Sequence, residues 1–163
     1  QPHSYPMLRS ALTALVSALP APVVEAHCDG PCGVYDPASA RVAAEAVLSM
    51  TKKLKGLEAP AAGDAAALAA LNNTFGRYGA IKAEEAQKTK KELLILWTDY
   101  FKPDHLATFP DLHDTFWKAA KLCSACKVNI DQAKAEELMA AVEKIHGMFW
   151  QSKGRSDAWV TAS

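Results

Sequence analysis

One short stretch, from His27 to Tyr35, sets the limits on how this chain can fold. It reads His-Cys-Asp-Gly-Pro-Cys-Gly-Val-Tyr, and it places an imidazole, two thiols, a carboxylate and a phenol within nine residues. Its two glycines and its proline form tight backbone loops and interrupt regular structure. Apolar periodicity is absent from this stretch, and Asp36-Pro37 then begins a helix. The stretch is therefore a loop, which we call the hook, that stands in front of a helical body.

The chain after the hook has the pattern of long helices. Asp36 is a good N-cap and Pro37 a good first residue for a helix that runs to about Lys55. Further helices are expected over 65–72, 81–101, 110–127 and from Asn129 or Asp131 to about Ser152. Apolar residues recur at helical spacing on the first and last helices, at Ala43, Val47, Met50 and Leu54 and at Leu138, Val142, Ile145 and Phe149. Strand signals are weak, so an all-α antiparallel four-helix bundle is predicted.

Length and charge exclude several classes of protein. A chain of 163 residues, half of them hydrophobic, suggests one domain with a sizeable core. The eighteen basic and eighteen acidic residues cancel, and the chain has no basic stripe. A nucleic-acid partner is therefore not expected. No run of about eighteen apolar residues occurs, so no membrane span is expected either.

The four cysteines form two close pairs, Cys28 with Cys32 and Cys123 with Cys126. Close pairs indicate metal or redox positions more naturally than a disulfide scaffold in a chain of this size. Thiolates and imidazole suit the later first-row metals, and a turn between Cys28 and Cys32 lets both sulfurs reach one ion. From spacing alone, a disulfide or half of a structural zinc site stays open. Zinc would need two more ligands.

Two blocks of the sequence resemble the nickel superoxide dismutase family. The run His-Cys-Asp-x-Pro-Cys-Gly-Val-Tyr-Asp-Pro, which begins at His27, is similar to that family's nickel hook. The run Leu-Trp-Thr-Asp-Tyr-Phe-Lys-Pro over 96–103 is similar to its other recognisable block, and Phe149-Trp150 fits its last helix. The resemblance covers roughly residues 26–155. It implies a four-helix bundle with a projecting hook, one nickel ion per subunit, and a homohexamer in which a neighbouring subunit packs over the hook.

The donors of the hook suit nickel that alternates between its divalent and trivalent states. If His27 is the first residue, its amine and the Cys28 amide nitrogen form one chelate ring, and that amide and the Cys28 sulfur form a second. Cys32 then completes a square plane, and the His27 imidazole can add an axial nitrogen. The resemblance implies the same ligand roles for His27, Cys28 and Cys32. It also implies the conversion of superoxide to oxygen and hydrogen peroxide.

Four further residues have supporting roles by the same resemblance. Asp29 braces the hook, and the Tyr35 hydroxyl lies near the open axial face. Tyr100 matches a second tyrosine near the site. These groups would order water, control anion access and support proton delivery, and are the candidate catalytic residues. Lys102 matches a position beside the site and could draw in the anion.

Residues 1–26 differ from the chain that follows. Four prolines break them, Glu25 is their one acidic residue, and an apolar run over 10–19 follows Arg9. This is a signal-like pattern, and a disordered or loosely helical leader is the alternative. We expect a leader or propeptide over 1–26, the catalytic domain over 27–155 and a frayed tail over 156–163. A cytoplasmic location is expected, with an exported or organellar one as the alternative.

The leader bears directly on the metal site. The square plane needs a free amine on His27, and in the uncut chain that nitrogen is the amide that joins Ala26 to His27. The full chain is therefore predicted to be an inactive precursor, which a protease cuts between these two residues. The hook is expected to order only around the metal.

The sequence departs from the family at two positions. In better-known members the axial imidazole is held by a glutamate paired to an arginine, and Ala43 and Glu85 stand at those places in this chain. We hypothesise that Glu85 reaches the His27 imidazole directly, within the subunit or from a neighbouring one, and replaces both partners. The connector before the long helix is also longer than in those members.

The cysteines and histidines outside the hook are weaker candidates for metal ligands. Cys123 and Cys126, at i and i+3 on a helix, are expected to be small core or surface residues. Glu143-x-x-His146 matches half of a di-iron bundle site, but no second copy exists. His3, His105 and His113 are expected at the surface or its boundary. The alternative function, from a different class, is a non-catalytic helical nickel- or metal-binding protein.

Overall fold

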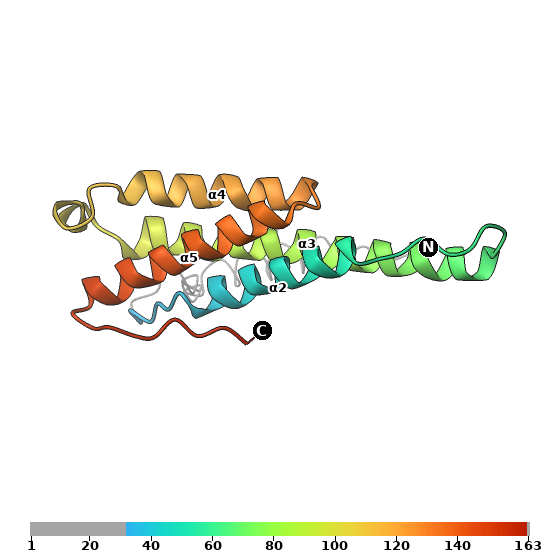
Figure 1. Ribbon diagram of the computed structural model, residues 1–163. Coiled ribbons are helices and arrows are strands. Elements are labelled where there is room, and N and C mark those ends of the chain that lie inside the picture. The colour runs from blue at the N-terminus through green and yellow to red at the C-terminus, as the bar shows by residue number, and fades with distance from the viewer. Residues whose placement is uncertain (1–31, 163) are drawn as a thin grey trace, which may run out of the picture. The chain divides into compact units, whose positions relative to one another are not determined.

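The computed structural model describes residues 32–162, and residues 1–31 and 163 lie outside that part. Contacts within the chain separate residues 1–32 from a body over 33–163. The four long helices of this body are α2 (Ala38–Lys55), α3 (Ala65–Ile95), α4 (Leu112–Val128) and α5 (Gln132–Ser152) (Figure 1). A π-helical segment η1 (Leu96–Tyr100) and a 3₁₀ segment η2 (Pro103–Ala107) lie between α3 and α4.

The four helices form the predicted antiparallel bundle. Helix α2 packs on α3 and α5, and α4 packs on the same two helices from the other side. The apolar stripe predicted for α5, at Leu138, Val142, Ile145 and Phe149, is fully buried. Of the stripe on α2, Ala43, Val47 and Leu54 are buried and Met50 is partly exposed. No strand occurs in residues 32–162. No helix within the described residues has the length and apolarity needed to cross a bilayer.

Helix α2 begins at Ala38, one residue after the predicted start at Pro37. The Asp36 Oδ1 accepts a hydrogen bond of 2.8 Å from the Ala38 amide, which satisfies one of the free amides at the helix start. Pro37 has helical dihedral angles and precedes the first helical residue. Lysines 52, 53 and 55 lie in the last turn, where positive charge is favourable beside the helix dipole.

The prediction of two separate helices over 65–72 and 81–101 was wrong, because α3 is one helix of 31 residues. Asn72, Asn73, Gly76 and Gly79 weaken a helix by up to about 1 kcal/mol each, but they do not break it. The alanine-rich first turns and the Asp64 cap, which accepts from the Ala67 amide at 2.9 Å, favour continuation. Residues 65–80 contain no buried side chain, and with the connector 56–64 they extend past α4 and α5 as an arm (Figure 1).

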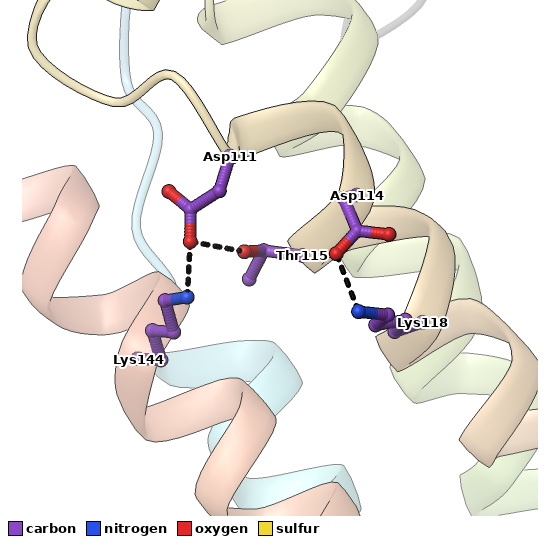
Figure 2. A network of polar contacts seen from close by, with 5 residues as sticks. All are labelled: Asp111, Asp114, Thr115, Lys118 and Lys144. Carbon is purple, nitrogen blue, oxygen red and sulfur yellow. Dashed lines mark hydrogen bonds and ion pairs between the residues drawn. The ribbon is translucent and has the colours of Figure 1, made fainter.

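Helix α4 begins at Leu112, two residues after the predicted start at Pro110. Lys144 of α5 contacts Asp111 Oδ2 at 2.5 Å, and the Thr115 hydroxyl donates to the same oxygen at 3.4 Å (Figure 2). The hydrogen bond from Lys144 lowers the pKa of Asp111. Asp114 and Lys118 pair one turn further along the same helix. The start of α4 is thereby joined to α5.

The other end of α4 is closed by a buried lysine of α3. Lys82 is 3% exposed, and its ammonium donates to the carbonyls of Cys126, Lys127 and Asn129. The last carbonyls of a helix have no partner within the helix, so Lys82 supplies donors that the backbone lacks. Burial lowers the pKa of Lys82.

The expectation that the tail is frayed was wrong for residues 156–162. The chain turns back at Gly154, whose φ of +67° favours glycine. The His146 Nε2 then donates to the Asp157 carbonyl at 3.1 Å, and the Trp159 ring lies 5.4 Å from the His146 ring. Near the end, the Ala162 amide donates to Glu45 Oε1 at 2.7 Å. The tail is thus attached to both α5 and α2.

Candidate metal centre

Cys32 is the one predicted nickel ligand within the described residues. Its thiol is exposed and free of any disulfide. Gly33 follows with a φ of +65°, a left-handed conformation that glycine adopts without strain. This turn ends the hook just before Asp36 caps α2. An exposed, unpaired thiol fits a late first-row metal, because the thiolate is the form that binds it.

The structure brings together two of the three candidate catalytic residues. Tyr35 precedes α2, and Tyr100 ends the π-helical segment η1. Their ring centroids are 5.5 Å apart, with the planes tilted by 54°. The η1 segment sets the position of Tyr100, because its last bond, from the Phe101 amide to the Leu96 carbonyl, spans five residues instead of four.

Tyr100 is held by residues from two further elements. Its ring packs on Phe149 at 4.6 Å and lies nearly parallel to His105, with centroids 5.8 Å apart. The Tyr100 hydroxyl lies 2.6 Å from the Ser152 hydroxyl. The ammonium of Lys153 lies over the Tyr100 ring, 5.1 Å from its centroid, in a cation–π contact. Tyr100 is therefore fixed at one end of the bundle, where η1, η2 and the end of α5 meet.

His105 has a defined hydrogen-bond role in this group. Its Nδ1 accepts a hydrogen bond of 2.9 Å from the Lys102 amide, so the ring proton of the neutral imidazole is on Nε2. The Lys102 residue itself is exposed, and its place beside the site stays a prediction. His105 is half-buried and His113 is exposed, so the boundary and surface positions predicted for these two residues are confirmed.

Comparison with known proteins shows to which family this chain belongs. The family model for nickel-containing superoxide dismutase matches residues 22–153. The chain is 38% identical over 144 residues to superoxide dismutase [Ni] of Streptomyces seoulensis, a match that covers 85% of this chain and 98% of that protein. This chain belongs to the nickel-containing superoxide dismutase family.

Other relatives agree in sequence and in structure. The superoxide dismutase [Ni] of Streptomyces coelicolor is 36% identical over 141 residues, with 85% of this chain and 98% of that protein covered. A native nickel superoxide dismutase structure at 1.30 Å matches with a TM-score of 0.67 and 35% identity, over 78% of this chain and 99% of that one. A nickel superoxide dismutase structure with nickel ligation of the oxidised state gives a TM-score of 0.68. The predicted family and fold are confirmed.

The remaining predicted ligands of this dismutase lie outside the described residues. The ligands His27 and Cys28 precede residue 32, as does the candidate catalytic residue Asp29, so their arrangement stays a prediction. Within residues 32–162, no group of three or more histidine, cysteine, aspartate or glutamate residues converges as a metal site. Glu143 and His146 belong to no such group among these residues.

The second cysteine pair is part of the bundle core. Cys123 and Cys126 are 0% and 1% exposed, which confirms the core position predicted as one of two possibilities. Burial raises the pKa of the Cys123 thiol to about 12, and burial also raises the pKa of Cys126. Both thiols are therefore protonated at neutral pH and are poor metal ligands.

The replacement of the family's bracing pair stays a prediction. Ala43 is fully buried in α2, and Glu85 is half-buried on α3. The His27 imidazole, which Glu85 is predicted to reach, lies outside the described residues.

Sequence reasoning missed three residues that surround Tyr100, namely His105, Ser152 and Lys153. A signal for two of them was present. Phe149 was identified as part of the last helix, and residues three and four positions later lie on the same helical face. Ser152 and Lys153 could thus have been placed beside whatever Phe149 contacts. The position of His105 depends on the 3₁₀ segment η2, which the sequence pattern did not predict.

Proposed function

We propose that this chain converts two superoxide anions and two protons into dioxygen and hydrogen peroxide at a nickel ion held by His27, Cys28 and Cys32. The observation that carries this proposal is the free, exposed Cys32 thiol within a complete hook sequence. When bound, nickel supplies the reversible one-electron step, because thiolate and amide donors bring its trivalent state into range. One nickel ion per subunit follows from one hook per chain.

The protein's own residues control access and protons. The exposed Lys102 and the Lys153 ammonium over Tyr100 place positive charge at this end of the bundle, and that charge attracts the anion. Tyr35 and Tyr100 pack together and limit the space open to water and substrate. Asp29 braces the hook. Each turnover consumes protons, so an ordered hydroxyl group beside the metal, such as that of Tyr35, supports their delivery.

Removal of the leader creates the site. A protease cuts between Ala26 and His27, and the freed amine of His27 then becomes a ligand. Neighbouring subunits of a homohexamer cover the hook, as the family resemblance implies. The enzyme acts in the cytoplasm. Export or transfer to an organelle is the alternative that the signal-like leader suggests.

The test compares three forms of the protein: the full chain, a chain that begins at His27, and that chain extended by Ala26. Nickel content is measured by mass spectrometry of the metal, and superoxide decay by pulse radiolysis. The chain that begins at His27 should bind one nickel ion and remove superoxide. The other two forms should be inactive, because neither has a free amine at His27.

Two results would contradict the proposal in different ways. Full activity with Ala26 attached would overturn the role of the His27 amine. Tight nickel binding without superoxide decay in the processed chain would support the alternative, a non-catalytic nickel-binding protein.

A further inference from the structure

Two hydroxyl groups at the end of α5 form a chain of hydrogen bonds with a defined direction. The Ser152 hydroxyl donates to the Phe149 carbonyl at 2.7 Å. The same serine oxygen lies 2.6 Å from the Tyr100 hydroxyl, a short distance for a bond between two hydroxyls. A hydroxyl has a single proton to donate. Since Ser152 donates its proton to Phe149, Tyr100 is the donor in the bond between the two side chains.

The end of the helix explains why the serine proton is held there. In a continuing α-helix, the Lys153 amide would donate to the Phe149 carbonyl. In this chain the Lys153 amide turns to the Trp150 carbonyl instead, because the backbone leaves the helix at this point. The Phe149 carbonyl is one of the acceptors that a helix end leaves without a backbone donor, and the Ser152 hydroxyl satisfies it.

The phenol cannot easily turn away from this partner. The Tyr100 ring packs between Phe149 and His105 and against Tyr35, with centroid distances of 4.6, 5.8 and 5.5 Å. The hydroxyl therefore stays beside Ser152, and its proton is directed toward the end of α5. The lone pairs of the phenolic oxygen are left to face other groups.

We propose that Ser152 is a positioning residue that holds the Tyr100 proton, so that the phenol accepts hydrogen bonds at the metal site and does not donate them. This rests on the proposed function, in which Tyr100 lies beside nickel. A water molecule or neutral hydrogen peroxide can donate to such an oxygen. A small anion meets lone pairs and is not retained there. Ser152 thereby favours exclusion of inhibitory anions, and the proton for peroxide comes from a group other than Tyr100.

The hydrogen-bond direction is tested first on metal-free protein that begins at His27. The tyrosine Fermi doublet in the ultraviolet resonance Raman spectrum reports whether a phenol donates or accepts. The difference spectrum between the protein and Tyr100→Phe isolates Tyr100 and should show a donor. In Ser152→Ala this donor signature should be lost, and in Ser152→Thr it should be retained.

The consequence for anions is tested on the nickel-loaded enzyme with sodium azide. In Ser152→Ala the Tyr100 proton is free to bind an anion, so the azide concentration for half inhibition should fall by about tenfold, a typical effect of one hydrogen bond to a charged group. Adding Tyr100→Phe to this variant should abolish the increase in azide sensitivity. Ser124→Ala is the matched control, since Ser124 is a partly buried serine that donates to the Ala120 carbonyl on α4. Ser124→Ala should change neither the Raman donor signature of Tyr100 nor the azide concentration for half inhibition.

Two results would overturn the proposal. One is an acceptor signature for Tyr100 in the unaltered protein, and the other is unchanged azide inhibition in Ser152→Ala. The Raman measurement needs no nickel, so it distinguishes failure of this inference from failure of the proposed dismutase activity.

Discussion

The hook and helix α4 each carry closely spaced cysteines, but their thiols have opposite properties. Cys32 of the hook is exposed, whereas Cys123 and Cys126 of α4 are almost fully buried. Burial raises the pKa of Cys123 to about 12. Cysteine spacing is nearly the same in the two regions, at i, i+4 and i, i+3. Spacing therefore does not separate a metal ligand from a core residue.

The secondary structure around the cysteines makes the difference. On α4, positions three apart share one helical face, and that face points into the bundle. In the hook, Cys32 is in contact with solvent and is followed by Gly33, whose φ is +65°. The sequence before it, with Gly30 and Pro31, predicts a loop and not a helix. A loop can also bend both sulfurs toward one ion, which a helix face cannot do without unwinding.

The largest expected effect is the loss of nickel and activity when a hook cysteine is replaced. Cys32→Ser should remove nickel and abolish superoxide decay, because a hydroxyl is a poor donor to nickel. The same is expected of Cys28→Ser. Folding should be unchanged by circular dichroism, since the Cys32 side chain is exposed. Cys123→Ala is the control and should keep both nickel and activity. A Cys32→Ser variant with near-normal turnover would show that the ligand assignment is wrong.

The second largest expected effect is a loss of folding stability when Lys82, the buried lysine beside Cys123 and Cys126, is replaced. Lys82→Met keeps the aliphatic stem but leaves the carbonyls of Cys126, Lys127 and Asn129 without their donor. The free energy of unfolding in urea should fall by about 2–3 kcal/mol, the cost of buried acceptors left unpaired. Activity at low denaturant should be unchanged. Lys88→Met, an exposed position on the same helix, should cost little. Equal losses in the two variants would contradict the role given to Lys82.

The smallest expected effect is a pH dependence of the free energy of unfolding that arises from the Cys123 thiol. The pKa of this thiol is about 12 in the folded chain against 9.0 for an ordinary cysteine, so the unfolded state loses its proton first. The resulting stability is complete below pH 9 and is lost as the pH rises toward 12. One unit above the ordinary pKa, at pH 10, the loss is about 1.4 kcal/mol.

The measurement is urea unfolding at pH 8 and pH 10 for the protein and for Cys123→Ala. Subtracting the two profiles removes the contributions of all other titrating groups, including Lys82. The variant should lose less stability over this range. Parallel profiles would show that Cys123 is not protected from ionisation by burial.

Most of the fold could be predicted from helical periodicity. The stripe from Leu138 to Phe149 and the Asp36 cap appear in the structure as the sequence indicates. The errors have a common cause, because local propensity was given more weight than the rest of the chain. Glycines 76 and 79 do not interrupt α3, and the tail over 156–162 is held by long-range contacts with His146 and Glu45 that no local pattern contains.

The candidate site was likewise predicted only in part from the sequence. The hook residues and the two tyrosines were predicted as site residues from sequence blocks, and the structure places the Tyr35 and Tyr100 rings 5.5 Å apart. The groups around Tyr100 were missed. Ser152 and His105 become its neighbours through the end of α5 and the 3₁₀ segment η2, whose geometry depends on tertiary packing and not on a recognisable motif.

The attached tail has a consequence for assembly. The family match ends at residue 153, and the chain then returns over α5 until the Ala162 amide meets Glu45 on α2. Thr161 and Glu45 line a surface groove between α2 and α5 together with Met139. This side of the bundle is occluded by the chain's own last residues. A neighbouring subunit of the proposed homohexamer would have to displace these residues before it could dock on this side.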